Sequence, residues 1–297
     1  MAPGREGGRH PGAVGVDTAV CDSHVHLFEP VRFPYASPRR FTPGEAPVAH
    51  LQAHLRATGL QRAVLVQPSV YGDNHACLLD GLLALGSQAR GVAVVSARTT
   101  AGELALLDHA GVRGARINLV VDHQTDPDLA RTRLQDVDHR IPAHWNVQLH
   151  VTLATLEALA DPIHQSGRRF VLDHLGLPDP ALGIDTPAWQ ALLQLMQGGN
   201  LYVKLSAPYL SSRTTAPHGD LAAHVRSLIG TRPDRVLWGS NWPHTLGTAR
   251  RANAGLDTVE AFRPVDDHAW LASCRLWAGE AAQAVLIDNA AALYGFD

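Results

Sequence analysis

The chain has 297 residues, of which 45% are hydrophobic and 18% charged, and its formal net charge is -3 with 17 histidines counted as neutral. This length suits one large domain with a sizeable core. The chain lacks a basic surplus and a Lys/Arg run, which argues against nucleic acid and against an anionic membrane surface as partners. Cys21, Cys77 and Cys274 are an odd number at irregular spacing, so they do not form a disulfide framework, and a reducing cytoplasm is expected.

The first 15 residues are rich in Gly, Arg and Pro and lack the apolar stretch of a signal peptide. We expect them to form a flexible N-terminal tail, followed by one domain over residues 16–297. No apolar run approaches the length needed to cross a bilayer.

Eight short apolar segments recur along the chain, and each predicts a β-strand. They cover residues 17–22, 62–67, 91–96, 112–118, 146–151, 169–173, 201–206 and 235–239. Most gaps between them are long enough for a helix, with helical segments at 46–58, 74–85, 153–164 and 186–196. Apolar strands that alternate with helices indicate a parallel sheet, and eight such units are typical of an α/β fold of the (β/α)8 TIM-barrel type.

Polar residues at the carboxyl ends of barrel strands are the natural site candidates, because those ends meet at one mouth. This rule selects His24, His26, Ser69, Arg113, Arg116, Gln148, His150, His174, Ser206 and Asn241. The first connection, residues 27–47, is long and aromatic and contains Tyr35, so we expect it to act as a lid or a pocket wall.

His24 and His26 stand at positions i and i+2 of a strand end, so both imidazoles point to one face. Such a pair can serve one metal ion or one oxyanion, or it can be two satisfied polar residues near a loop. A third histidine, His174, at another strand end favours a functional site. Asp173 beside it is read as a helix N-cap, and His150 fits either the site or the core.

A guanidinium inside a barrel mouth commonly holds a carboxylate, and the alternative is a surface salt bridge. Arg113 and Arg116 are three residues apart and cannot share one strand face, and Arg116 is the preferred inward residue. The hydroxyls of Ser69 and Tyr71 can donate to a substrate or cap a loop. A G-x-S-x-G elbow and a P-loop are both absent from the sequence, which argues against a serine nucleophile and a phosphate cradle.

Several motifs together resemble the amidohydrolase-2 family, and most closely the hydrolases of the 2-pyrone-4,6-dicarboxylate lactonase type. The resemblance covers about residues 17–296. Its motifs lie at 22–28 (DSHVHLF), 67–74 (QPSVYGDN), 91–95 (GVAVV), 112–118 (VRGARIN), 172–176 (LDHLG), 203–206 (VKLS), 238–244 (WGSNWPH) and 288–296 (DNAAALYGF).

The resemblance implies a barrel in which His24, His26 and His174 polarise a lactone carbonyl. If a divalent metal such as Zn or Mn is bound, these three residues are its expected ligands, and metal-independent action is equally compatible with the family. Asn241 completes the catalytic set. The substrate-binding candidates are Tyr35, Ser69, Tyr71, Arg116, His150 and His244.

Three departures from the family pattern bear on function. Asn241 stands where the family has an Asp that activates water, and a neutral amide cannot accept a proton at neutral pH. Loss of a general base costs a factor of about 10²–10⁴. Leu177 and Leu210 stand where the family carries arginines that grip carboxylates, so a less charged substrate is expected.

Three functions remain open at this point. The first is a hydrolase that opens a small carboxylated lactone, pyrone-like or muconolactone-like, with Asn241 engineered in or natural and another base such as His244 or His150 compensating. The second is a non-hydrolytic enzyme, such as a cyclase, dehydratase or decarboxylase of a biosynthetic pathway. The third is a binding barrel without chemistry. In each case the partner is a small molecule, and a homodimer is possible.

Overall fold

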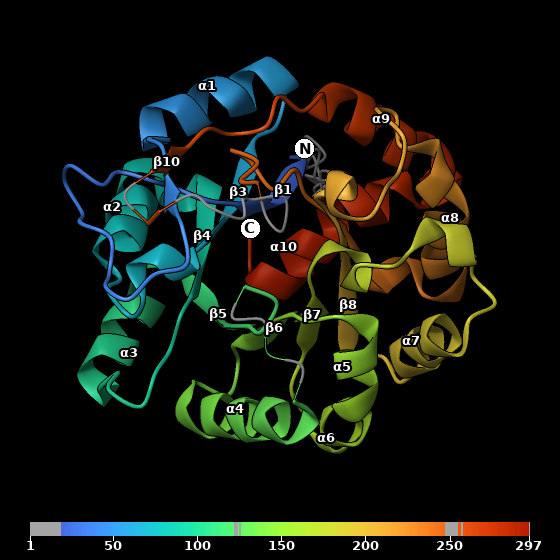
Figure 1. The fold of residues 1–297 in the computed structure, drawn as a ribbon, viewed down its shortest axis with the longest axis horizontal. Coiled ribbons are helices and arrows are strands. Elements are labelled where there is room, and N and C mark those ends of the chain that lie inside the picture. Colours follow the sequence, from blue (N-terminus) through green and yellow to red (C-terminus); the bar gives the residue numbers. More distant parts are fainter. Residues whose placement is uncertain (1–18, 122–123, 125, 247–254, 257, 297) are drawn as a thin grey trace, which may run out of the picture.

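The computed structural model describes residues 19–121, 124, 126–246, 255–256 and 258–296 (Figure 1). The expected tail over residues 1–15 lies outside this range. Eight parallel strands pair in the order β1-β3-β4-β5-β6-β7-β8-β9. They are β1 (Cys21–Val25), β3 (Arg62–Val66), β4 (Ala89–Ala93), β5 (Val112–Asn118), β6 (Asn146–His150), β7 (Phe170–Leu172), β8 (Leu201–Leu205) and β9 (Val236–Trp238).

The first and last strands approach each other and close the sheet into a barrel. Val25 forms a β-bridge with Trp242, and the His26 amide donates to the Trp242 carbonyl at 2.8 Å. The buried carboxylate of Asp22 accepts from the amides of His24 and Ser240 at 3.1 and 2.9 Å. These bonds hold the chain after β9 against the strand that carries His24. The expected single-domain (β/α)8 TIM barrel is confirmed.

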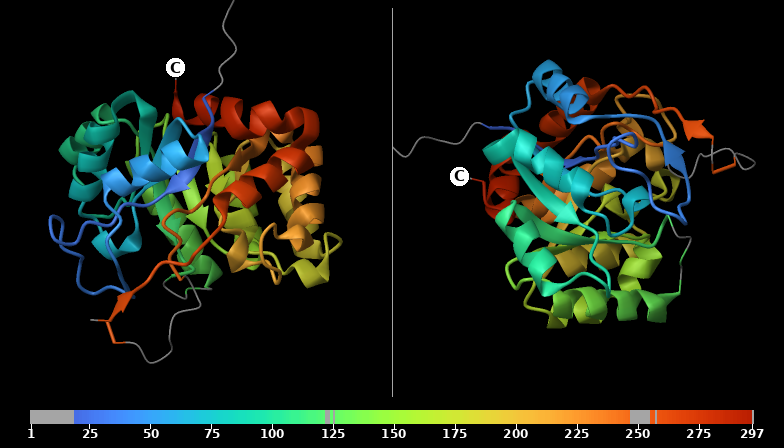
Figure 2. Two further views of the ribbon diagram at one scale, coloured as in Figure 1. Left: turned by 90° about the horizontal axis from the view of Figure 1, so that it is seen from above. Right: turned by 90° about the vertical axis from the view of Figure 1, so that its left-hand side faces the viewer.

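The helices surround the strands (Figures 1 and 2). They are α1 (Val48–Thr58), α2 (Ala76–Leu85), α3 (Ala101–His109), α4 (Pro127–Arg140), α5 (Leu153–Ala158), α6 (Ala160–Gln165), α7 (Pro187–Gln197), α8 (Ala222–Thr231), α9 (Asp267–Ala278) and α10 (Asn289–Tyr294). Several begin at side-chain caps typical of helix starts, such as the capping box of Thr100 and Glu103 and the Thr186 cap followed by Pro187.

The barrel interior is filled by apolar side chains at its amino-terminal end. Cys21, Val171, Tyr202 and Leu237 from the strands cluster there with residues of α10 and the C-terminus, including Tyr294. Helix α10 lies across this end, as the red helix near the centre of Figure 1 shows. The barrel is therefore a packed core and not a pore, and only its carboxyl-terminal mouth is open to chemistry.

The first connection forms part of the wall of this mouth. It pairs with a late segment through a two-stranded sheet of β2 (Thr42–Pro43) and β10 (Val259–Glu260). Phe28 is fully buried and stacks on Phe262, with ring centroids 5.8 Å apart. The wall predicted for residues 27–47 is present. Among the described residues, no helix is long and apolar enough to cross a membrane.

The predicted strands agree with those observed apart from small shifts at their ends. The first strand was expected over residues 17–22 and is observed at Cys21–Val25, so His24 lies within the strand. Residues 17 and 18 fall outside the described range. The shift follows from pairing, because Cys21 is in register with Arg62 and the strand continues until Val25 meets Trp242.

Candidate active site

A pocket with about 450 Å³ of empty space opens at the carboxyl ends of the strands. It is lined by His26, Phe28, Phe41, Pro68, Ser69, Arg116, Asn118, Val121, His150, His174, Leu210, Asn241 and Thr245. Its polar residues come from the tips of different strands, which is the arrangement that the barrel rule predicts. Six of the residues that the sequence singled out therefore line one cavity: His26, Ser69, Arg116, His150, His174 and Asn241.

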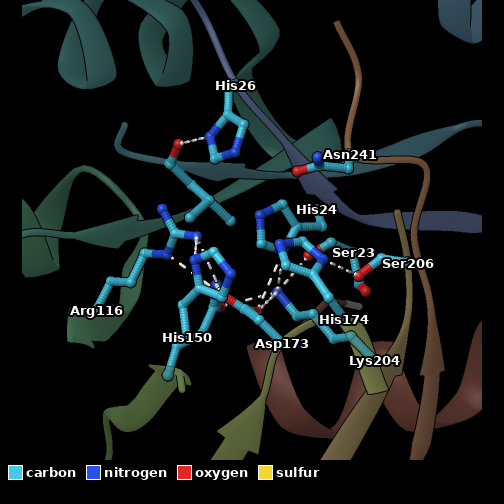
Figure 3. Close-up of polar contacts among 12 residues, drawn as sticks. Ser23, His24, His26, Arg116, His150, Asp173, His174, Lys204, Ser206 and Asn241 are labelled. Atoms are coloured by element: carbon cyan, nitrogen blue, oxygen red, sulfur yellow. Dashed lines mark hydrogen bonds and ion pairs between the residues drawn. The ribbon is translucent and has the colours of Figure 1, made fainter. Parts of the chain in front are cut away.

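Four imidazoles form a continuous cluster at the base of this pocket (Figure 3). Ring centroids are 4.9 Å apart for His24 and His26, 4.8 Å for His24 and His174, and 4.8 Å for His174 and His150. All four rings are buried. The i, i+2 pair on β1 does present both rings to one face, and His174 joins them from the end of β7.

Asp173 is the anionic centre beneath these rings. Its fully buried carboxylate accepts from Arg116 Nε and from Gln148 Nε2 at 3.2 and 3.1 Å, and His24 Nδ1 lies 3.2 Å from its second oxygen. Burial alone would raise the pKa of Asp173, but His24, Arg116 and Lys204 outweigh it and hold the pKa well below its usual range. Asp173 does stand at the N-cap position of the turn His174–Gly176, but its side chain makes no capping hydrogen bond, so the expected capping role of the carboxylate was wrong.

The four histidines are held neutral. Burial is the main cause that lowers the pKa of His26, to about 3, with Arg116 adding to it. Burial likewise lowers the pKa of His24, His150 and His174 well below the ordinary value, and neighbouring imidazoles, Arg116 or Lys204 contribute. A neutral imidazole offers one nitrogen with a free lone pair and one with an N–H, so each ring can accept one hydrogen bond and donate another.

Hydrogen bonds fix how two of these rings are presented. The Nδ1 atom of His26 lies 2.6 Å from the Val66 carbonyl oxygen, which can only accept, so His26 carries its proton on Nδ1. His174 Nδ1 is 2.8 Å from Ser206 Oγ. Because Nδ1 of His26 is used to donate, its Nε2 holds the free lone pair.

Asn241 reaches the same pocket from the chain after β9. Its backbone has a positive φ of 71°, and its amide N–H donates to the His24 carbonyl at 2.9 Å. The side-chain Nδ2 donates to Tyr209 Oη at 2.8 Å. This fixes the amide orientation and leaves Oδ1, which is buried and has no hydrogen-bond partner within the described chain. An acceptor atom is therefore left over on a residue that lines the pocket together with His26 and His174.

Lys204 is a site residue that the sequence reasoning missed. Its fully buried ammonium donates to the Ser23 carbonyl at 2.7 Å and to Gln148 Oε1 at 2.8 Å, and it lies 3.9 Å from Asp173. Burial lowers its pKa to about 8. One sequence signal could have revealed it. The chain has 25 lysine and arginine residues, and Lys204 is the only lysine among them.

Other predicted residues lie at the edge of the site or outside it. Ser69 lines the pocket, whereas Tyr71 Oη is taken by the Glu29 amide and Tyr35 Oη donates to the Pro43 carbonyl. Arg113 pairs with Asp108, away from the pocket, which agrees with the preference for Arg116. His244 bonds to Asp267 at 2.9 Å and lines a separate surface depression.

Arg116 has contacts unlike those of a free substrate clamp. Its Nε bonds to Asp173, and its Nη2 lies 3.2 Å from Asp173 and 3.3 Å from His150 Nδ1. Arg116 is 6% exposed as a residue and also forms part of the pocket wall. It binds the Asp173 carboxylate in place of a ligand carboxylate.

His24, Asp173 and His174 fit a divalent metal ion as a donor set. Their ligand atoms all lie within 4.8 Å of one another, and all three residues are buried. His24 Nε2 and Asp173 Oδ1 have no hydrogen-bond partner among the described residues. Nitrogen and oxygen ligands of this kind suit Zn²⁺ or Mn²⁺. His26, the third expected ligand, is not part of this group. The Lys204 ammonium beside Asp173 would weaken the hold on such an ion.

Comparison with known proteins places the fold and site in one family. The Amidohydrolase family model (Amidohydro_2) matches residues 21–296. The chain is 31% identical over 290 residues to a 2-pyrone-4,6-dicarboxylate hydrolase of Comamonas testosteroni, covering 92% of this chain and 89% of that protein. It is 27% identical over 281 residues to a 4-sulfomuconolactone hydrolase of Hydrogenophaga intermedia, covering 92% and 88%.

Two further matches complete the comparison. A D-galactarolactone isomerase of Agrobacterium fabrum is 28% identical over 225 residues, covering 75% of this chain and 76% of that protein. A crystal structure of a putative 2-pyrone-4,6-dicarboxylic acid hydrolase from Pseudomonas putida superposes with a TM-score of 0.75 at 30% identity, covering 95% of this chain and 99% of that one. The family match covers nearly all of the described barrel, and the chain belongs to the amidohydrolase family of enzymes.

Proposed function

We propose that this protein is a hydrolase that opens a small lactone by adding water to its ring carbonyl. The observation that carries the proposal is the cluster of four neutral imidazoles at the pocket that Asn241 also lines. Among the described residues, Asn241 Oδ1 has no hydrogen-bond partner there. The names of two relatives, which are hydrolases of a pyrone and of a muconolactone, support the same reaction class.

The proton path follows from the hydrogen bonds. Asn241 Oδ1 can accept from a water molecule and orient it, although it cannot take its proton. His26 lines the pocket and its Nε2 carries the lone pair, so it accepts that proton as the water oxygen bonds to the carbonyl carbon. When the ring C–O bond breaks, the same proton passes from His26 to the leaving oxygen. One water is consumed, and a carboxylic acid and a hydroxyl are formed.

A divalent metal ion held by His24, Asp173 and His174 would polarise the carbonyl as a Lewis acid. The roles of His26 and Asn241 are the same with or without it. We propose that Asn241 occupies the place of the family's water-activating Asp, and that an imidazole takes over the work of the carboxylate.

The pocket favours a substrate with few charges. Phe28, Phe41 and Leu210 form an apolar part of the wall, and the Arg116 guanidinium is already bound to Asp173. Leu210 stands where the family resemblance places an arginine. We therefore propose a small lactone with at most one acidic group.

The test is a panel of pyrones, muconolactone-like lactones and simple lactones incubated with the protein in water enriched in oxygen-18. The proposal predicts that at least one lactone is opened and that one solvent oxygen appears in the new carboxylate. Ring opening without solvent oxygen would contradict it.

The isomerase relative favours one second candidate, rearrangement of a lactone without net hydrolysis. The same imidazoles can move a proton between two positions of a bound ring. In the oxygen-18 experiment, that function would give an isomer of the starting lactone with no incorporated label.

A further inference from the structure

We propose that His150 is a catalytic hydrogen-bond donor to the oxygen of the reacting carbonyl, and that Arg116 positions it by fixing the proton on Nε2. This inference rests on the proposed lactone chemistry, because it names the group that receives the developing charge. It gives Arg116 a role different from that of a substrate clamp.

The tautomer of His150 follows from donor chemistry. Arg116 Nη2 lies 3.3 Å from His150 Nδ1. A guanidinium has five N–H donors and no acceptor, and it remains charged in proteins. Nδ1 must therefore supply the lone pair in this contact, and a neutral His150 has its hydrogen on Nε2. Arg116 cannot swing away easily, because Nε and Nη2 are also held by Asp173 at 3.2 Å each.

The Nε2–H of His150 has no hydrogen-bond acceptor among the described residues. His150 lines the pocket, is 7% exposed, and its Nε2 is buried without a hydrogen-bond partner among the described residues. A buried donor without a partner destabilises the folded protein, because it loses its hydrogen bond to water and gains none in return. A carbonyl oxygen bound in the pocket that His150 and His174 both line would relieve this cost by accepting from His150 Nε2.

A neutral imidazole is the appropriate donor for this task. The guanidinium of Arg116 stands against Nδ1, so a second proton on that nitrogen would face a cation directly and the ring carries only the proton on Nε2. As water adds, the carbonyl oxygen gains negative charge, and the Nε2–H bond to it strengthens while the proton stays on nitrogen. The Arg116 cation on the opposite side of the ring makes that N–H a stronger donor. Removal of one such preorganised donor costs about 10²–10³ in rate.

The fixed donor and the fixed acceptor are complementary. His26 has its proton on Nδ1 and offers a lone pair at Nε2, whereas His150 accepts at Nδ1 and offers a proton at Nε2. The same pocket thus receives one acceptor and one donor from imidazoles of opposite tautomer. Figure 3 shows the His26 ring above His24 and the His150 ring beside His174, with the contacts that fix each one.

Three substitutions at one position test the role of the donor. His150→Gln places an amide N–H close to the Nε2 position, His150→Asn reaches only as far as Nδ1, and His150→Phe has no donor. We expect kcat to fall by about 10²–10³ for Phe and Asn and by less than about tenfold for Gln. His224→Gln, at a buried histidine of α8 whose ring packs edge-to-face against Trp189, is the matched control and should leave kcat unchanged. Equal losses for Gln and Phe would overturn the donor role.

The tautomer is tested without any turnover. In protein labelled with ¹⁵N-histidine, we expect the His150 signals to show a protonated Nε2 and an unprotonated Nδ1. Arg116→Lys, which keeps a donor-only cation, should preserve this pattern, and Arg116→Met should give a mixture of tautomers. A protonated Nδ1 in the unsubstituted protein would refute the inference even if lactones are opened. The expected tautomer in a protein that opens no lactone would instead point to failure of the proposed function.

Discussion

At the scale of single residues, the site depends on charges buried beneath the imidazoles. Asp173 is shared by Arg116 and Lys204, and its partners come from strands β5 and β8. Two cations around one carboxylate leave a net positive charge below the rings, which helps to keep the histidines neutral. Asp173 therefore acts as the buried anion that binds these two cations, and its side chain does not cap a helix.

Replacement of Lys204 tests how far this buried network stabilises the fold. Lys204→Met leaves the Ser23 carbonyl and Gln148 Oε1 without their donor and Asp173 without one cation. We expect the free energy of unfolding to fall by about 3 kcal/mol or more, measured by urea titration. Arg131→Met, which breaks an exposed pair with Asp128, is the control and should change it by less than about 1 kcal/mol. Equal effects would contradict the account of Lys204.

Leu210 tests the origin of substrate choice. It lines the pocket, so Leu210→Arg would bring a guanidinium to the apolar wall. A charge-assisted hydrogen bond contributes about 1.5–3 kcal/mol, so KM for a dicarboxylate lactone should fall about tenfold or more relative to that for an uncharged lactone. Leu83→Arg, at an exposed position of α2 that does not line this pocket, is the matched control. A similar change in both variants would show that Leu210 does not select the substrate.

At the scale of elements, the fold was largely predictable and the site only partly so. Apolar runs and their spacing indicate the strands, because a parallel strand that is buried on both faces has apolar residues at nearly every position. The partners of Asp173 could not be read in this way, since Arg116, Gln148 and Lys204 come from three other strands. Their meeting depends on the barrel register, in which Arg116 is paired with Gln148. The tautomers of His26 and His150 likewise depend on contacts across strands.

A glycine after β9 allows its chain to approach β1. A Cβ atom at Gly239 would lie 3.0 Å from His24 Cβ and 3.1 Å from the His24 amide nitrogen. Gly239→Ala should therefore displace His24 and reduce kcat by about tenfold or more, because small misplacement of a catalytic group is costly. Gly230→Ala in α8 is the control, since no atom lies within 4 Å of its new Cβ, and it should stabilise the protein by up to about 1 kcal/mol. Unchanged kcat in Gly239→Ala would refute this constraint.

At the scale of the whole molecule, four neutral buried histidines make stability depend on pH. Their pKa values are lowered in the folded state, to about 3 for His26, so below pH 6.5 the unfolded chain binds protons that the folded protein does not. Stability then falls as pH falls, by at most about 1.4 kcal/mol per pH unit for each histidine. Urea titrations at pH 7, 6 and 5 should show this loss, and His150→Phe should reduce its slope. Equal or greater stability at pH 5 would contradict the neutral cluster.

The central claim is that the barrel opens a lactone without a carboxylate at position 241. The most direct test is the turnover of a lactone panel by the protein itself, by Asn241→Asp and by Asn241→Ala. We predict that the unsubstituted protein is active and that Asn241→Ala loses about 10²-fold or more, because the oxygen that orients water is removed. Turnover by Asn241→Asp alone would contradict the claim and would show that the imidazoles cannot replace the carboxylate.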